Sequence, residues 1–155
     1  MDETNNDDDI AGIVAGDMYA LDEAARGLGI VINEAHLNYA RVSMAVREDM
    51  LNSHRVCHGG VIFTLADTAF AYASNSENIS TLALSCSIDF AEVVSLGEKL
   101  TAVAKKNFRN NRTGVYDVVV TNESDVVVAI FRGNSYQLKA ESVPGLNKRL
   151  GRGGT

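Results

Sequence analysis

The segment from Gly60 to Ser74 most constrains how this chain can fold. Its sequence, "GVIFTLADTAFAYAS", has no polar face at helical spacing, and Asp67 is its one charged residue. A helix that is apolar almost all round is a buried helix. The rest of the chain must therefore cover this helix. An ionised carboxylate inside it is unfavourable unless a partner is present.

The remaining sequence supplies β-strands that can form this covering layer. Residues 36–46 alternate apolar and polar side chains, as a half-buried strand does. Four β-rich segments follow the helix and are separated by turn residues: 80–90, 99–108, 114–122 and 126–138. Residues 10–28 have the apolar spacing of an amphipathic helix. The sequence predicts an α+β fold, with a five-stranded antiparallel sheet around a long central helix and an additional N-terminal helix.

The two ends of the chain differ from its body in composition. The formal charge is −6, and five acidic residues lie in the first nine positions without a Lys or Arg. We expect residues 1–9 to be a disordered acidic leader, residues 10–140 to form a single domain, and the Gly-rich residues 141–155 to be a flexible tail.

Composition also bears on location and partners. The body without the leader is nearly neutral, which gives no support to nucleic-acid binding. No apolar run reaches the roughly 20 residues that a membrane span needs. Two cysteines, Cys57 and Cys86, make no disulfide framework. We expect a cytoplasmic protein that binds neither nucleic acid nor membrane.

Asp67 is the first candidate catalytic residue. It lies about two turns inside the helix, too far from the start to be an N-cap. The positions three and four residues away hold no Lys, Arg or His, so a local salt bridge is excluded. A buried or half-buried carboxylate remains. Desolvation raises the pKa of such a group, which suits a general base.

The motif His58-Gly59-Gly60 opens the same helix. Glycines at a helix start leave backbone N–H groups free, and the positive end of the helix dipole lies behind them. Such a site could hold an oxyanion or a polarised carbonyl. A simple tight turn explains the glycines equally well.

The spacing of these two features has a geometric consequence. Gly59 and Asp67 are eight residues apart, which is about 12 Å along a helix. They cannot both contact one reacting carbonyl within a single chain. If both act on it, they come from different subunits. A homodimer is also expected from packing, because one sheet leaves a flank of the central helix uncovered.

The histidines of this region favour a structural role. His54 and His58 have i, i+4 spacing with Cys57 between them, but they lie in a predicted loop without a third metal ligand nearby. We therefore expect no metal, and we expect the His58 ring to bond to backbone in the turn. Asn52 and His54 could orient a water molecule.

A basic cluster lies around the predicted hairpin "KKNFRNNRTG". It contains Lys105, Lys106, Arg109 and Arg112. A solvated turn is the usual explanation for such a run, and a docking site for phosphates is the alternative.

Four segments resemble one known family in the order in which they occur. They are "MLNSHRVCHGGVIFTLADTAFAYASNS", "SIDF", "RTGVYDV" and "IFRGNS". Together they resemble the PaaI-type hotdog-fold thioesterases of bacterial phenylacetate degradation. This resemblance implies hydrolysis of phenylacetyl-CoA or its ring-hydroxylated derivatives, without a cofactor. It also implies a homodimer with two interfacial sites, assembled into a homotetramer.

The resemblance also implies roles for individual residues. Asp67 would be the general base or the nucleophile, and the Gly59 N–H of the other subunit would polarise the thioester carbonyl. Asn52 would hold the water or the thioester, and His58 would support the turn. The residues implied in substrate binding, including binding of the CoA phosphates and nucleotide, are Gly60, Thr68, Ala83, Arg109, Arg112, Thr113, Gly114, Gly133 and Asn134. Ala83 stands where some relatives have a Ser that assists the water, a role that Ser85 would have to fill here.

Other functions remain open from sequence alone. They are a hotdog hydratase or dehydratase acting on acyl-CoA, a thioesterase for medium-chain acyl-CoA, and a binding module without hydrolysis. A binding module would gain nothing evident from the desolvated Asp67.

Overall fold

The computed structural model describes residues 3–152. Its helices are α1 (Glu3–Leu21), α2 (Glu23–Gly27), the 3-10 turn η1 (Glu48–Met50), α3 (Gly59–Ser74) and α4 (Leu146–Arg149). Its strands are β1 (Val31–His36), β2 (Tyr39–Ala45), β3 (Thr81–Phe90), β4 (Lys99–Asn110), β5 (Thr113–Thr121) and β6 (Val127–Gln137). No helix within this range has the length and apolarity that crossing a membrane requires.

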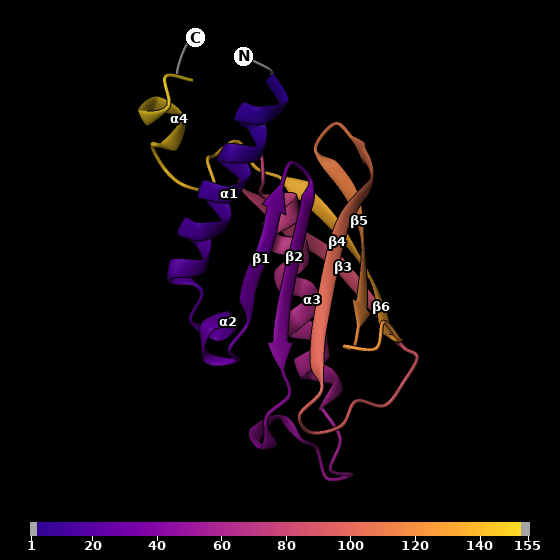
Figure 1. Cartoon of the computed structure of the whole chain (residues 1–155). Helices are drawn as coiled ribbons and strands as arrows, with labels where there is room; N and C mark the ends of the chain where they lie inside the picture. The colour runs from indigo at the N-terminus through magenta and orange to yellow at the C-terminus, as the bar shows by residue number, and fades with distance from the viewer. Residues whose placement is uncertain (1–2, 153–155) are drawn as a thin grey trace.

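The strands form one antiparallel sheet that curls around α3. The strand order is β1-β2-β4-β5-β6-β3, so β1 and β3 are the two edges. Figure 1 shows α3 behind β2 and β4, with α1 and α2 beside β1 and both termini at one end of the molecule. The predicted architecture, an antiparallel sheet around a long helix with an N-terminal helix, is confirmed.

The number of strands differs from the prediction, because the sheet has six rather than five. The additional strand is β1, which pairs with β2 through a two-residue turn in which Asn38 has a φ of 59°. Its sequence, "VINEAH", is short and polar, and all of its residues are exposed or half-buried. Such an edge strand has no strong alternating pattern, so the sequence did not reveal it.

The predicted helix over residues 10–28 is divided into two. α1 ends at Leu21, and the Asp22 side chain then accepts a hydrogen bond from the Ala25 N–H at 3.0 Å to cap α2. The break turns the chain towards β1. It also brings Asp22 to α3, where the Tyr72 hydroxyl donates to its other oxygen at 3.0 Å.

Both ends of the chain contain helix that the sequence did not predict within the described residues. Residues 3–9 belong to α1 rather than to a disordered leader. Ile10 and Val14 of α1 form a small buried cluster with Leu146 of α4, which lies in the segment expected to be flexible. Ion pairs between α1 and the tail reinforce this contact: Asp7–Arg152 and Asp17–Arg149. Residues 1–2 of the leader and 153–155 of the tail lie outside the described range.

Candidate active site

One face of α3 is left partly open by the sheet. The open positions Gly60, Thr64, Asp67 and Ala71 recur at helical spacing, whereas most other positions of α3 are buried. The sheet and the helices α1 and α2 cover the remaining faces. The uncovered flank that the sequence predicted is therefore present, and Asp67 lies on it.

The surroundings of Asp67 desolvate its carboxylate. Phe63 and Phe70 lie one turn before and after it, and both rings pack against Phe131 of β6, with centroids 5.3 and 5.9 Å away. Among the residues that the structure describes, none forms a hydrogen bond or ion pair with Asp67. Burial, and then the charge of Asp22, raise the pKa of Asp67 above the ordinary value of 3.8. The carboxylate is thus a proton acceptor of increased basicity without a competing partner.

The start of α3 presents one free backbone donor. His58 is the N-cap, and its Nδ1 accepts a hydrogen bond from the Gly60 N–H at 3.1 Å. This is the ring-to-backbone bond that the sequence predicted. The Gly59 N–H donates to no acceptor within residues 3–152. At the positive end of the helix dipole, this N–H can stabilise a carbonyl oxygen that gains negative charge.

The two features lie on one straight element. Gly59 is the first residue of α3 and Asp67 follows eight residues later, so about 12 Å of helix separates them. A thioester carbonyl is contacted by its donor and by its base or nucleophile at about 3 Å each. Within one chain, the Gly59 N–H and the Asp67 carboxylate therefore cannot both contact one carbonyl.

Asn52 shapes the loop that leads into α3. Its side-chain oxygen accepts hydrogen bonds from the backbone N–H groups of His54 at 2.9 Å and Val56 at 3.3 Å. Its amide nitrogen donates to no group in the described part of the chain. That nitrogen is the part of Asn52 that can still reach a water or a thioester.

Cys57 in the same loop does not resemble a nucleophile. It is 5% exposed, and burial together with the charge of Glu98 raises the pKa of its thiol to about 11. The thiol is therefore protonated near neutral pH. Residues 3–152 also contain no group of three His, Cys, Asp or Glu side chains that could hold a metal ion.

Three of the residues implied in substrate binding meet at one cavity. Thr113, Gly114 and Asn134 line a cavity of about 270 Å³ beside the β4–β5 hairpin. The remaining lining residues are Leu84, Phe108, Val115 and Ser135. The Asn134 amide donates to the Ser85 hydroxyl at 2.9 Å, so Ser85 is engaged with β6. This cavity can accept an apolar or amide-bearing chain at the sheet surface.

The two arginines of the basic cluster have different surroundings. Arg109 makes two hydrogen bonds to the carboxylate of Glu77, one of them between Nη2 and Oε1 at 3.1 Å. Arg112, at the hairpin tip, pairs with no acidic residue among those described. Arg112 therefore keeps an unneutralised charge, whereas the charge of Arg109 is already balanced.

Two other residues of the substrate-binding set lie in the core. A Cβ on Gly133 would lie 2.7 Å from ring carbons of Phe70, so packing alone requires glycine there. Thr68 is 7% exposed, and its hydroxyl donates to the Thr64 carbonyl at 2.7 Å. Ala83, in contrast, is exposed on the edge strand β3.

Sequence reasoning missed three residues close to these groups. Asp22 adds charge near Asp67, Glu77 engages Arg109, and the Phe90 ring lies 2.9 Å from where a Cβ on Gly59 would stand. The N-cap pattern of Asp22 before "EAARG" could have been recognised. Glu77 and Phe90 are brought to their partners by tertiary folding and had no local signal.

Comparison with known proteins identifies the family of this chain. Residues 54–129 match the family model described as "Thioesterase superfamily". The acyl-coenzyme A thioesterase PaaI of Escherichia coli (strain K12) is 45% identical over 121 residues, which cover 78% of this chain and 86% of that protein. The structure of the E. coli PaaI protein from the phenylacetic acid degradation operon matches with a TM-score of 0.85 and 42% identity, over 86% of this chain and 97% of that chain.

Two further structures extend the comparison. A mutant of the phenylacetic acid degradation protein PaaI from Thermus thermophilus has a TM-score of 0.73 and 35% identity, over 76% of this chain and 100% of that chain. A Streptococcus mutans protein solved with acetyl CoA has a TM-score of 0.70 and 26% identity, over 72% of this chain and 90% of that chain. The chain belongs to the thioesterase superfamily: it has the hotdog fold and is a thioester hydrolase.

Replacing Asp67 by Asn should stabilise the fold at pH 7, because it removes a charge that burial disfavours. The pKa of Asp67 is higher in the folded than in the unfolded protein, so wild-type stability falls as pH rises from 3.8 to the folded-state value. The gain from Asp67→Asn should thus be larger at pH 7 than at pH 4. Thermal unfolding should show a rise of roughly 2–4 °C at pH 7, equivalent to about 1 kcal/mol. A lower melting temperature at pH 7 would mean that the carboxylate has a stabilising partner in the assembled protein.

Proposed function

We propose that residues 10–140 form an acyl-CoA thioesterase domain that hydrolyses phenylacetyl-CoA or its ring-hydroxylated derivatives. The observation that carries this proposal is the desolvated Asp67 on the open flank of α3, a helix that begins with the Gly59 N–H. Within residues 3–152, neither the Asp67 carboxylate nor this N–H has a hydrogen-bond partner. The names of the E. coli and Thermus thermophilus relatives support the aryl-acetyl substrate. The acetyl CoA bound to the Streptococcus mutans protein supports a CoA thioester.

A homodimer completes the site. In our proposal, the open flank of α3 packs against the same flank of a second copy, with the helices antiparallel. Gly59 of one subunit then approaches Asp67 of the other, and two equivalent sites form about one two-fold axis. The unpaired edge of β3 supports this arrangement, because it exposes Leu82 (56%), Leu84 (62%) and Phe90 (52%).

Two dimers can associate further through the outer face of the sheet. Val119 of β5 and Ile130 of β6 are adjacent in register there and are 39% and 50% exposed. Burying this apolar row would produce the proposed tetramer. We also retain the cytoplasm as the proposed location, since both cysteines are free thiols.

The reaction needs few groups. The Gly59 N–H of one subunit donates to the thioester oxygen and stabilises it as negative charge develops. As a base, Asp67 of the other subunit takes a proton from water while the water oxygen bonds to the acyl carbon. The carbon–sulfur bond then breaks, and the proton passes to the CoA sulfur. As a nucleophile, the carboxylate would itself bond to the acyl carbon while the carbon–sulfur bond breaks and the CoA thiolate leaves. Water would then hydrolyse the resulting anhydride, which frees the acid and regenerates the Asp67 carboxylate, and a proton released from water would pass to the thiolate.

The CoA moiety can bind along the β4–β5 hairpin. The cavity lined by Thr113, Gly114 and Asn134 can hold the pantetheine chain. In our proposal, the unpaired charge of Arg112 attracts the CoA phosphates.

A hydrolysis screen tests the function. Thiol release should be measured with phenylacetyl-CoA, its hydroxylated derivatives, and short-, medium- and long-chain acyl-CoA esters. The aryl-acetyl esters should give the highest kcat/KM, and Asp67→Asn should lower it by about 10²–10⁴-fold. Activity confined to fatty acyl chains would refute the aryl substrate, and hydration of an enoyl-CoA without thiol release would refute the reaction type.

The role of the Gly59 N–H can be isolated by a matched pair of variants. Gly59→Pro removes the N–H at the first helical position, where proline is well tolerated and where His58 has a compatible ψ of 132°. Gly59→Ala adds a Cβ towards Phe90 but keeps the N–H. We expect Gly59→Pro to lose about 10²–10³-fold in kcat relative to Gly59→Ala, with similar melting temperatures. Equal kcat values for the two variants would exclude this N–H as the oxyanion donor.

A further inference from the structure

Glu77 connects two parts of the chain that otherwise lie apart. It belongs to the connection between α3 and β3, residues 75–80, and it holds Arg109 near the end of β4. The Glu77 and Arg109 side chains are shielded from solvent to about the same extent, with 26% and 25% of their surface exposed. Because the guanidinium binds both carboxylate oxygens, this ion pair fixes direction as well as distance.

The connection that carries Glu77 is itself rigidly held. Asn75 and Asn78 are 5% and 1% exposed, and both side chains are hydrogen-bonded through their oxygen and their nitrogen. The Asn75 oxygen accepts from the Thr81 N–H at 2.9 Å and from the Ser142 hydroxyl at 2.7 Å. The Asn78 oxygen accepts from the Val143 N–H at 2.8 Å. The C-terminal segment therefore fixes the backbone on both sides of Glu77.

The hairpin at the other end of the ion pair is restrained on one side only. Its β5 side pairs with β6, where Thr113 faces Tyr136, whereas β4 is no longer paired with β2 beyond Lys105. Arg109 faces Gly114 in the β4–β5 ladder, and the register shifts just before it, between Lys106 and Phe108. Beyond Arg109 the hairpin turns at Asn111, which has a φ of 57°, and continues into Arg112. The Glu77–Arg109 pair is thus the ionic side-chain link from this hairpin to the rigid connection after α3.

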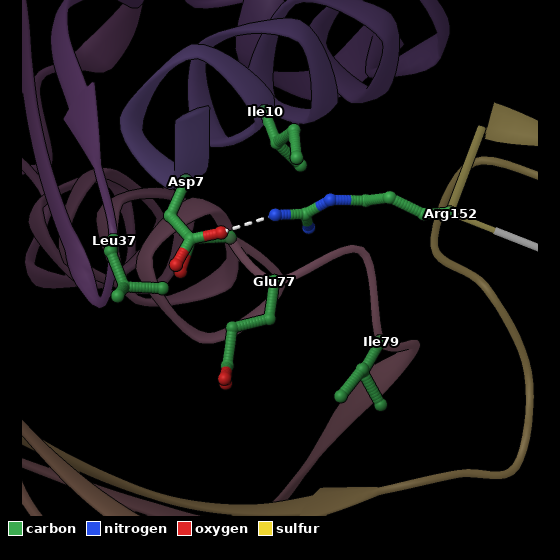
Figure 2. A pocket seen from close by; sticks show the side chains of 7 residues that line it. Asp7, Ile10, Leu37, Glu77, Ile79 and Arg152 are labelled. Atoms are coloured by element: carbon green, nitrogen blue, oxygen red, sulfur yellow. Dashed lines mark hydrogen bonds and ion pairs between the residues drawn. The ribbon is translucent and has the colours of Figure 1, made fainter. Parts of the chain in front are cut away.

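The far side of Glu77 faces a small cavity. Its volume is about 160 Å³, and Asp7 and Arg152 line it with Leu37 and Ile79. Figure 2 shows Arg152 extending towards Asp7 across this space, with the Glu77 side chain pointing away from that ion pair. An amide of the same shape can replace the carboxylate there without a clash.

We propose that Glu77 is a positioning residue for CoA binding: through Arg109 it fixes the hairpin that presents Arg112, Thr113 and Gly114 to the substrate. This inference rests on the proposed CoA thioesterase function. The rival explanation is that Arg109 itself binds a phosphate and Glu77 restrains it. The two explanations predict opposite effects of removing the Glu77 charge, because only in the rival case does a useful cation become free.

The test is Glu77→Gln, assayed with the best acyl-CoA substrate and with free CoA as an inhibitor. We expect KM and the inhibition constant of CoA each to rise roughly threefold to tenfold with kcat unchanged, because binding is weakened and chemistry is not. Amides of residues 107–114 should exchange hydrogen faster. The exchanged pair Glu77→Arg with Arg109→Glu should recover part of the affinity.

Glu34→Gln, which removes the ion pair to Arg41 at the other sheet edge, is the matched control and should leave KM and CoA inhibition unchanged.

Two results would overturn the inference. An unchanged KM in Glu77→Gln would mean that the ion pair does not control the hairpin. A lower KM would mean that Arg109 is a phosphate ligand that Glu77 restrains. Neither result contradicts the proposed thioesterase function. Absence of acyl-CoA hydrolysis by the wild-type protein, in contrast, would refute that function.

Discussion

The structure depends on one constraint, the incomplete covering of α3. Its alanines and aromatic residues need a surrounding layer, and a single curled sheet leaves the flank with Gly60, Thr64 and Asp67 open. The same flank carries a carboxylate that burial has made more basic. A monomer would gain nothing from this arrangement. In the proposed dimer, the energetic cost of desolvating Asp67 would be coupled to catalysis, because the Gly59 donor would come from the other chain.

Local patterns in the sequence predicted the parts that local physics determines. The all-apolar helix, the four strands after it and the isolated Asp67 can each be recognised within a short window. The sequence pattern gave wrong predictions where tertiary contacts determine the local structure. The polar segment Val31–His36 is a strand because β2 pairs with it. Residues 143–146 of the tail are packed against the domain because buried asparagines and α1 hold them.

The candidate site shows the same division. The bond from the Gly60 N–H to His58 could be predicted, because both groups lie within one turn. The different surroundings of Arg109 and Arg112 could not be predicted. Glu77, which pairs with Arg109, lies 32 residues away from it in the sequence. Gly133 is a further example. Its glycine resembles a ligand-binding signal in sequence, whereas the Phe70 ring accounts for it in three dimensions.

Complementation between subunits tests the central claim, that each site combines Gly59 of one chain with Asp67 of the other. Differently tagged Asp67→Asn and Gly59→Pro chains should be co-expressed, and the mixed dimer isolated through both tags. Each parent homodimer has two defective sites, whereas the mixed dimer has one intact site and one doubly defective site. The mixed dimer should therefore recover about half of the wild-type kcat per dimer. A mixed dimer no more active than its parents would contradict the central claim, because that result requires both groups to act within one chain.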